Sequence, residues 1–345
     1  MAQNDINQMR QEDVAISSRI RLARNLKAYP FTPRLSAQQR GEIVNKVSSA
    51  IANCSDEKIR ELLFIDMNSM KPVDKQVLVE KHLISPEFAE GDKARAAVIS
   101  KDEHISIMVN EEDHLRLQCI FQGIQFDAAW KLCNKLDDIL GDTLDFAFDK
   151  TSGYLTCCPT NAGTGLRASV MMHLPALSMT GYIKGILETC AKIGVVVRGI
   201  YGENSEASGY MYQVSNQVTL GQSEEEIIAG IGNITAQIAE KERMLRSELY
   251  KQSPSRFEDR VFRAFGLLAN ARIMSTEECL KLLSDVRLGV IMGLVTGIEL
   301  KELNKLMMMI QPAYLQKLAG AQLTPDERDM KRAELVRRMM KEYIH

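Results

Sequence analysis

The sequence lacks the features that mark several broad classes of protein. Lysine and arginine (43 residues) nearly balance aspartate and glutamate (45 residues), so the formal net charge of −2 does not attract the whole chain to nucleic acid or to an anionic membrane. The longest apolar run, residues 288–300, is too short and too interrupted by glycine to span a bilayer. The first residues show no basic-then-apolar signal pattern. We therefore expect a cytoplasmic protein with no direct nucleic-acid or membrane contact.

Cysteine spacing argues against a structural metal site or a disulfide framework. The seven cysteines are scattered, and no pair has the C-x-x-C spacing typical of zinc or redox sites. We expect reduced thiols throughout. Cys157 and Cys158 are the exception of interest, because they are adjacent and precede a glycine-rich turn where a thiol can face a ligand.

The chain is long enough for one large domain and a smaller companion. Its first two thirds mix helices with short β-like runs, which favours an α+β domain over regular βαβ alternation. These runs cover residues 62–67, 96–99, 105–110, 194–201 and 210–220. Ser36 and Gln39 form a capping-box pattern that predicts the start of a helix.

The pattern changes after Gly221. Ser223 and Glu226 form a second capping box, and isoleucine and leucine then recur at helical spacing as far as residue 249. Further helix starts are predicted at Ser275 and Thr324. We therefore predict two domains, residues 1–222 and residues 223–345, of which the second is all-helical.

Two segments combine arginine with other groups suited to binding charged ligands. Alternation along an extended strand places Arg19 and Arg21 on one face, which suits phosphate oxygens but also a solvated strand edge. Residues 110–116 follow a β-like run and contain three consecutive carboxylates before Arg116. This cluster is either a solvated turn or a site for a guanidinium or Mg²⁺.

Two more segments couple arginine to glycine. Gly163 and Gly165 precede Arg167, and they permit either close approach to a ligand or simply a tight turn. Arg198 follows an apolar run and precedes two glycines and a carboxylate. Arginines placed repeatedly at strand ends and glycine turns are difficult to explain as chance surface charge in a nearly neutral chain. The pattern favours a site for a polyanion.

These segments resemble the phosphagen kinases, the family of creatine and arginine kinases. The match runs in order through SSRIRLARN, NEEDHLR, CPTNAGTGLRAS and RGIYGE and covers roughly residues 14–220. The resemblance implies an α+β catalytic domain, in which an antiparallel sheet is flanked by helices, and it implies ATP and Mg²⁺ as cofactors. No G-x-x-x-x-G-K-[ST] motif occurs, which is consistent with arginines taking the place of a P-loop.

The resemblance also implies the residues of the nucleotide site, and no protein ligands for the metal, since Mg²⁺ is held mainly through the nucleotide. The expected ATP-binding residues are Ser17, Ser18, Arg19, Ile20, Arg21, His82, Arg116, Arg167, Ala168, Ser169, Val170, Met171, Arg198, Gly199, Ile200, Tyr201, Gly202 and Glu203. His82 has the weakest local support, because a lone histidine is more often structural.

Catalytic roles follow from the same resemblance. A guanidino acceptor stays protonated, with a pKa above about 12, and therefore needs a base. By resemblance, Glu112 is that base, and Glu203 matches the second carboxylate of the arginine-specific members. Cys158 matches the reactive cysteine of the family, which we interpret as assisting rather than nucleophilic.

Two departures favour the bacterial protein-arginine kinase branch of this family. The small-molecule kinases place a helical domain before the SSR motif, which here begins at residue 17, so we expect a site open to arginine on a protein surface. The segments RVFRAFGLLANAR and LLSDVRLG after the kinase region also resemble this branch. So does a motif implied to bind phosphoarginine, at Arg328, Asp329, Met330, Lys331, Arg332 and Ala333. Without the resemblance, a basic solvated helix explains this last motif better.

The resemblance implies protein substrates and the partners McsA, ClpC and CtsR, with substrates marked for Clp degradation and the repressor CtsR inactivated. Apolar helical faces also suggest a homodimer, although core packing explains them nearly as well. A free-arginine kinase and a non-catalytic phosphoarginine reader are the alternatives. Intact Glu112, Glu203 and five arginines argue against the reader.

Overall fold

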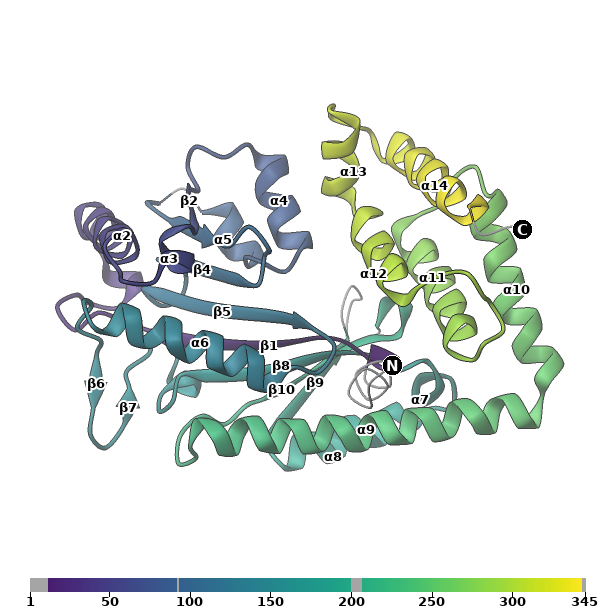
Figure 1. Ribbon diagram of the computed structural model, residues 1–345, viewed down its shortest axis with the longest axis horizontal. Helices are drawn as coiled ribbons and strands as arrows, with labels where there is room; N and C mark the ends of the chain where they lie inside the picture. The colour runs from purple at the N-terminus through teal and green to yellow at the C-terminus, as the bar shows by residue number, and fades with distance from the viewer. Residues whose placement is uncertain (1–11, 92, 200–206, 343–345) are drawn as a thin grey trace. The chain divides into compact units, whose positions relative to one another are not determined.

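A computed structural model describes residues 12–91, 93–199 and 207–342. The fold is α+β, as predicted, and is built on an eight-stranded sheet flanked by helices (Figure 1). Along the sheet the strands lie in the order β2 (Leu63–Asp66), β3 (Ala96–Ile99), β4 (Ile105–Val109), β5 (Leu115–Gln122), β1 (Ala15–Arg24), β8 (Leu166–His173), β10 (Met211–Asn216) and β9 (Val195–Gly199). The pairs from β2 through β5 to β1 are antiparallel. A separate hairpin consists of β6 (Phe148–Asp149) and β7 (Gly153–Tyr154).

Helices occupy most of the remaining chain. The helices before residue 222 are α2 (Ala37–Ala52), α3 (Glu57–Arg60), α4 (Pro72–Glu80), α5 (Pro86–Glu90), α6 (Phe126–Gly141), α7 (Pro175–Met179) and α8 (Ile183–Lys192). Those after it are α9 (Glu224–Gln252), α10 (Pro254–Asn270), α11 (Thr276–Ile291), α12 (Leu300–Met309), α13 (Pro312–Ala319) and α14 (Pro325–Lys341). Short 3₁₀ turns cover Thr32–Arg34, Pro159–Asn161 and Ser208–Tyr210.

Local sequence signals account for several helix starts. Ser36 caps α2 through a reciprocal box with Gln39, and Thr324 caps α14 in the same way with Glu327. Ser275 accepts a hydrogen bond from the N–H of Glu278 at the start of α11. The predicted helix starts are therefore confirmed, and so are the five predicted β-like runs as far as the structure describes them. The run over residues 210–220 contains a shorter strand than expected, β10.

The chain divides into two compact units, and each unit draws on more than one segment. Unit 1 comprises the described parts of residues 1–16, 171–214 and 234–345, and unit 2 comprises residues 17–170 and 215–233. Strands β1, β8 and β10 run from one unit into the other. Secondary structure does become all-helical after residue 222, but the domain division at that position stays a prediction. Within the described part of the chain, no helix is long and apolar enough to cross a membrane.

In unit 2 the two faces of the sheet have different neighbours. On one face, Arg24 of β1 forms a buried ion pair with Asp137 of α6, with 2.7 Å between Nη2 and Oδ2. Figure 1 shows α6 lying along this part of the sheet. On the other face, Met108 of β4 packs with Leu83 and with Phe88 of α5 in a small apolar core. The alternation of β1 and β5 decides which side chains meet each layer.

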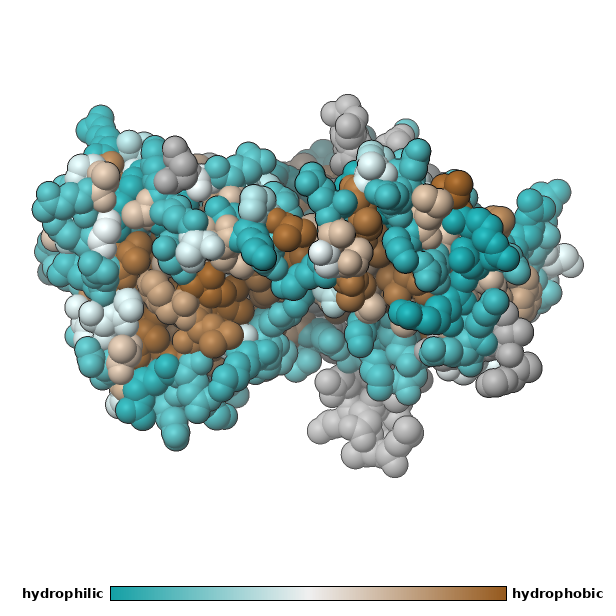
Figure 2. Space-filling view, turned by 90° about the horizontal axis from the view of Figure 1, so that it is seen from above, coloured by the Kyte–Doolittle hydropathy of each residue, from teal (hydrophilic) through white to brown (hydrophobic). Residues whose placement is uncertain are grey.

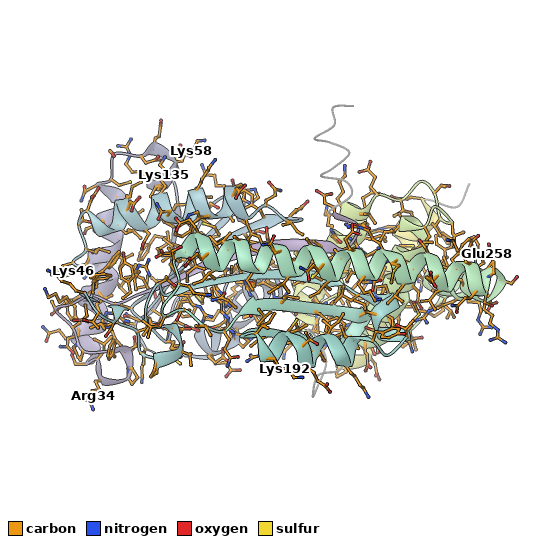
Figure 3. All side chains as sticks on the ribbon, turned by 90° about the horizontal axis from the view of Figure 1, so that it is seen from below. Arg34, Lys46, Lys58, Lys135, Lys192 and Glu258 are labelled. Atoms are coloured by element: carbon orange, nitrogen blue, oxygen red, sulfur yellow. The ribbon has the colours of Figure 1, made fainter. Side chains whose placement is uncertain are left out.

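The surface is largely hydrophilic, and apolar residues gather on one part of the face drawn in Figure 2. Leu63 and Phe64 of the edge strand β2 are among the exposed large apolar side chains, at 49% and 40% exposure. Charged side chains such as Arg34, Lys46 and Lys58 point outward (Figure 3). This distribution is ordinary for a globular surface, apart from the apolar edge strand.

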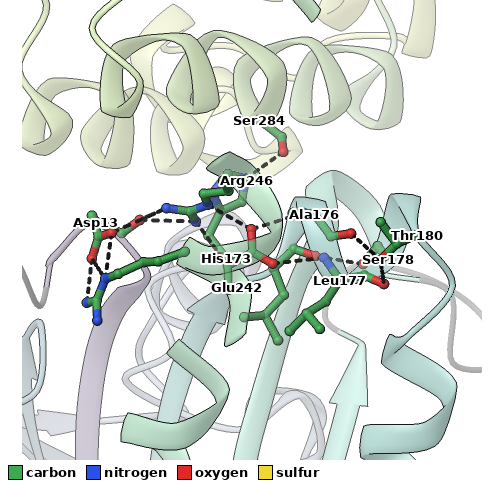
Figure 4. Close-up of polar contacts among 11 residues, drawn as sticks. Asp13, His173, Ala176, Leu177, Ser178, Thr180, Glu242, Arg246 and Ser284 are labelled. Atoms are coloured by element: carbon green, nitrogen blue, oxygen red, sulfur yellow. Dashed lines mark hydrogen bonds and ion pairs between the residues drawn. The ribbon is translucent and has the colours of Figure 1, made fainter. Parts of the chain in front are cut away.

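Unit 1 has an apolar core that its helices share, and it also contains a buried polar network (Figure 4). The carboxylate of Glu242 in α9 accepts hydrogen bonds from the N–H groups of Ala176 (3.0 Å) and Leu177 (2.9 Å), and from Arg246 at 2.7 Å. His173, at the end of β8, is bonded to the Ser284 hydroxyl at 2.6 Å. Burial lowers the pKa of His173, which therefore stays neutral.

Candidate active site

Strand β1 turns two arginines toward one face of the sheet. Ser18, Ile20 and Leu22 alternate with them and are fully buried on the opposite face. Arg19 and Arg21 are partly exposed. The period of two that predicts a shared face for these guanidinium groups is therefore observed.

The register between β1 and β5 brings a third arginine to the same face. Arg21 lies opposite Gln118, and Ala23 lies opposite Arg116. Residues directly opposite each other in an antiparallel pair project to the same side, so Arg116 and Gln118 share the face of Arg19 and Arg21. Gln118 accepts a hydrogen bond from Arg19 Nη1 at 3.4 Å through its Oε1 atom.

The fourth arginine comes from β8. The Oγ atom of Ser169, two residues after Arg167, accepts a hydrogen bond from Arg19 Nε at 3.4 Å. Burial and, to a smaller extent, the charges of Arg116 and Arg167 together lower the pKa of Arg19 to about 10. Four guanidinium groups from three strands therefore lie close enough to repel one another.

Arg21 lies in the most unfavourable electrostatic environment of the cluster. Burial first, and then the charges of three other arginines, lower its pKa well below the usual value, while Glu111 opposes this effect. The Nε atom of Arg21 is buried without a hydrogen-bond partner among the described residues. A buried cationic donor of this kind is costly unless an anion accepts from it. The cluster is therefore suited to a polyanion.

His82 lies beside this cluster. It connects α4 to α5 with a positive φ of 58°, and its carbonyl accepts a hydrogen bond from Gln118 Nε2 at 2.9 Å. Burial and the charge of Arg19 lower the pKa of His82 to about 4. The ring is therefore neutral at pH 7 and can approach the arginines without adding charge.

A short loop between β4 and β5 carries the acidic residues. Asn110 opens the loop with a φ of 64°, and its N–H donates to the carbonyl of His114 at 2.9 Å. Glu111 forms an ion pair with Arg116 at 2.8 Å and accepts from the Ser85 hydroxyl at 2.7 Å. Its other oxygen accepts from the N–H of Glu112 at 2.8 Å. We call residues 110–114 the base loop.

Glu112 projects from this loop and is exposed. Partial burial and the charges of Asp113 and Glu111 raise its pKa, and Arg116 and Arg167 act in the opposite direction. A carboxylate with a raised pKa, beside a cluster that attracts anions, has the properties of a general base.

The segment with adjacent cysteines lies against the base loop. The N–H of Cys157 donates to Asp113 Oδ1 at 2.7 Å. Burial raises the pKa of the Cys157 thiol, as do the charges of Asp113 and Glu112. Cys158 begins a 3₁₀ turn, and its Sγ atom is 3.0 Å from the Thr160 hydroxyl oxygen. The predicted thiol and the predicted base are therefore neighbours in the fold.

The two glycines of the Gly-x-Gly turn approach the protein backbone. Gly163 has a φ of 105°, and an added Cβ would lie 2.4 Å from the carbonyl oxygen of Thr219. Gly165 has a φ of 64°, and an added Cβ would lie 2.7 Å from the carbonyl oxygen of Ala23. Of the two interpretations open from the sequence, the tight turn accounts for both glycines.

Three described residues of the predicted nucleotide site belong to unit 1 rather than to unit 2. Arg198 and Gly199 end β9, and they belong to unit 1, as does Met171. Ile200, Tyr201, Gly202 and Glu203 lie outside the described residues. The remaining members of the predicted nucleotide site belong to unit 2, and they are Ser17, Ser18, Arg19, Ile20, Arg21, His82, Arg116, Arg167, Ala168, Ser169 and Val170.

The predicted phosphoarginine motif lies on α14 in unit 1. Arg332 is buried, and it donates to the carbonyls of Ile310 and Met274, each at 2.8 Å, and to Asp329. Ala333 is also buried, whereas Met330 and Lys331 are exposed. Arg328 is half-buried and makes no side-chain hydrogen bond that the structure describes. The guanidinium of Arg332 therefore acts as a cross-link within the helical core.

Sequence reasoning gave no role to Ser85 or Gln118, although both contact the site. Gln118 is two residues after Arg116 and so shares its face, a signal that alternation along the strand provides. Ser85 is more than twenty residues from Glu111 along the chain, and it has the local signature of a helix cap for α5. No sequence pattern connects it to the base loop.

Comparison with known proteins identifies the family. Residues 42–245 match a sequence profile of the ATP:guanido phosphotransferase C-terminal catalytic domain, and residues 254–344 match one of the protein-arginine kinase McsB C-terminal domain. The protein-arginine kinase of Moorella thermoacetica is 52% identical over 96% of this chain and 95% of its own length. The chain belongs to the protein-arginine kinase family.

Other members and solved structures agree with this assignment. The protein-arginine kinase of Caldanaerobacter subterraneus subsp. tengcongensis is 51% identical over 94% of this chain and 96% of its own length. Among solved structures, the duplicated taurocyamine kinase of Schistosoma mansoni is similar, with a TM-score of 0.63 and 28% identity over 78% of this chain and 38% of that chain. A lombricine kinase shares the fold, with a TM-score of 0.61 and 24% identity over 69% of this chain and 68% of its own.

Proposed function

We propose that this protein-arginine kinase family member transfers the γ-phosphoryl group of ATP to arginine side chains of proteins. The observation that carries the proposal is the gathering of Arg19, Arg21, Arg116 and Arg167 in unit 2, beside a loop that projects Glu112. The arginines form a site for a polyphosphate, and Glu112 supplies a base for the acceptor.

The arginines act by positioning and by neutralising charge. Phosphoryl transfer spreads negative charge over the transferred oxygens, and fixed guanidinium groups stabilise that charge without reorganising. Because Arg21 is held charged against burial and against its neighbours, it gains most when phosphate oxygens arrive. We propose that the residues flanking these arginines also belong to the nucleotide site, namely Ser17, Ser18, Ile20, Ala168, Ser169, Val170 and Met171.

Glu112 accepts the proton that the acceptor must lose. A guanidinium has no lone pair suitable for attack, so one N–H proton passes to the carboxylate as the N–P bond forms. The bond between the γ-phosphorus and its bridging oxygen breaks, and ADP leaves with the electron pair. Cys158 assists by placing a thiol near the acceptor, and Glu203 is proposed as the second carboxylate that orients it.

Magnesium would be held mainly through the nucleotide. Within the described part of the chain, no group of three or more histidine, cysteine, aspartate or glutamate side chains could hold a metal ion. The ion would supply additional neutralisation of phosphate charge.

The acceptor is proposed to be arginine in proteins because the relatives that match nearly their full length carry the name protein-arginine kinase. We further propose that substrates are marked for Clp degradation, that CtsR is inactivated, and that McsA, ClpC and a second copy of the chain are partners. Recognition of phosphoarginine would fall on Arg328 and Lys331, since Arg332 is bound to backbone carbonyls.

The test is mass spectrometry of intact protein and peptides after incubation with Mg-ATP and casein, or with free arginine, at neutral pH, where the N–P bond survives. The proposal is supported if casein arginines gain phosphate and free arginine does not, and if the Glu112→Ala variant transfers no phosphate. Transfer to free arginine alone refutes it in favour of a phosphagen kinase. Absence of both, with McsA added, favours a phosphoarginine reader.

A further inference from the structure

Asn25 immediately follows β1 and is almost fully buried, at 2% exposure. Its side-chain carboxamide donates two hydrogen bonds and accepts one. Nδ2 donates to Asp113 Oδ1 at 2.6 Å and to the carbonyl of Leu155 at 3.0 Å. Oδ1 accepts from the N–H of His114 at 2.9 Å. One side chain therefore connects three segments that are far apart in sequence.

The contact with Asp113 extends to the cysteine segment. The same Oδ1 atom of Asp113 also accepts from the N–H of Cys157 at 2.7 Å. Asp113 is buried, so these hydrogen bonds are not exchanged with water. We call Asn25, Asp113 and the backbone of Cys157 the amide clamp.

The clamp lies one residue away from both proposed reactive groups. Glu112 precedes Asp113, and Cys158 follows Cys157. Fixing the two clamped residues therefore fixes the separation of the carboxylate and the thiol. We propose that Asn25 is a positioning residue that holds the base loop and the cysteine segment at the separation required for transfer. This inference rests on the proposed function.

Adjacent contacts hold the same junction. The N–H of Leu26 donates to His114 Nδ1 at 2.9 Å, so His114 Nε2 carries the proton that bonds the carbonyl of Pro30 at 2.9 Å. The carbonyl of Asn25 accepts from the N–H of Ala147 at 2.7 Å. Because these backbone contacts persist when the Asn25 carboxamide is removed, the substitution should loosen the loop without unfolding the strand end.

The clamp also has an electrostatic consequence. Burial has the largest effect on the pKa of Asp113 and raises it, and the charge of Glu111 acts in the same direction. The hydrogen bonds from Cys157 and Asn25 and the charge of Arg116 lower this pKa. Loss of the Asn25 donor therefore favours protonated Asp113. A neutral Asp113 no longer raises the pKa of the neighbouring base. The acid limb of the pH profile of kcat should then move to lower pH.

Partial burial has the largest influence on the pKa of Glu112 and raises it. The charges of Asp113 and Glu111 also raise this pKa, and those of Arg116 and Arg167 lower it. Asp113→Asn changes one of these and leaves the others in place. It should move the acid limb in the same direction as Asn25→Ala. A residue that served stability alone would leave this limb unchanged.

The experiment compares Asn25→Ala with a destabilising control away from the clamp contacts, Leu136→Ala, which removes a buried side chain of α6. Asn25→Ala should lower kcat for protein arginine by roughly 10- to 100-fold, the scale expected for a misplacement near 1 Å. The KM for Mg-ATP should stay within about twofold, because the clamp does not touch the arginines. Leu136→Ala should leave kcat nearly unchanged at temperatures where it is folded.

A swap of the two clamp residues tests the geometry directly. Asn25→Asp alone places two carboxylates at hydrogen-bond distance and should be the least active variant. Combining it with Asp113→Asn restores one donor and one acceptor between the two side chains, whereas the carbonyl of Leu155 and the N–H of Cys157 both lose their partners. The double variant should recover only part of the activity relative to Asn25→Asp, because the carboxylate repulsion is relieved while the bond to Cys157 stays broken. An unchanged kcat in folded Asn25→Ala would overturn the proposal.

Thiol alkylation separates this inference from the proposed function. Cys158 and Cys54 are both partly exposed, and Cys54 lies away from the clamp on the loop after α2. In Asn25→Ala, iodoacetamide should label Cys158 roughly threefold faster or more relative to Cys54, because the segment opens locally. If the wild-type chain transfers no phosphate to protein, the proposed function fails. An unchanged labelling ratio overturns the clamp whether or not transfer occurs.

Discussion

Removing one arginine of the cluster should stabilise the nucleotide-free protein. Arg19→Met keeps most of the length of the side chain and deletes a guanidinium that lies beside Arg116 and Arg167. Its bonds to Ser169 and Gln118 are both 3.4 Å long and are therefore weak. Most substitutions destabilise a folded protein, so the expected sign is unusual and informative.

The magnitude follows from the pKa of Arg19, which falls from the usual range of an arginine to about 10. A lowering of about 2.5 pKa units corresponds to about 3.5 kcal/mol at about 1.4 kcal/mol per unit. The side chain is partly exposed, and solvent screening reduces the effect, so we expect a gain of about 1–2 kcal/mol. For a chain of this length the unfolding temperature should rise by about 2–5 °C.

The assay is thermal unfolding with and without Mg-ADP. Wild-type protein at a hundredfold excess of nucleotide over Kd gains about 2.7 kcal/mol, and Arg19→Met should lose most of this gain. Arg34→Met, which removes an exposed arginine, should change neither value by more than about 0.5 kcal/mol. If Arg19→Met lowers the unfolding temperature without nucleotide and keeps the full shift with it, the reasoning is refuted.

Three further predictions concern stability in unit 2. Gly163→Ala should lower the free energy of urea unfolding by more than about 3 kcal/mol, because an unfavourable φ alone costs about 1–3 kcal/mol and the added Cβ also meets the carbonyl of Thr219. A loss below about 1 kcal/mol would contradict the tight turn. Asp137→Asn should cost roughly 3–5 kcal/mol by stranding buried Arg24, whereas replacing both residues by leucine and methionine should cost far less. The pKa of His82 is about 4 in the folded protein and 6.5 in the unfolded chain. The neutral ring therefore contributes its full share to the free energy of unfolding above pH 6.5, and this share is lost as the pH falls toward 4. His82→Asn should therefore make urea stability less dependent on pH across that window, and equal slopes would contradict the assignment.

Local patterns predicted those parts of the site that depend on a single strand. The alternation in residues 17–21 was sufficient to place Arg19 and Arg21 on one face, because the side-chain period of a strand is fixed by its geometry. The same reasoning extended to β5 would have found Gln118. The strand that carries Arg167 was not predicted, because Gly163 and Gly165 just before it are typical of a turn.

The parts that depend on tertiary register could not be read from the sequence. The bond between Asn25 and Asp113 joins residues 88 positions apart. It exists only because the end of β1 lies beside the start of β5 in this antiparallel pair. Arg332 shows the same limit, since a basic helix pattern does not reveal that a guanidinium is turned inward to the carbonyls of Ile310 and Met274.

The core and the site are specified by the same register, which explains why the arginine cluster can tolerate its own repulsion. A shift of β5 by one residue against β1 would turn Arg116 and Gln118 toward α6 and expose Leu117 on the arginine face. Burying an apolar side chain such as Ile20 or Leu117 is worth about 1.5–3 kcal/mol, and several of them line the opposite face. This apolar burial opposes the repulsion among the guanidinium groups. The fold therefore holds the cations together before any nucleotide arrives, and a core substitution that loosens this register should weaken nucleotide binding without touching an arginine.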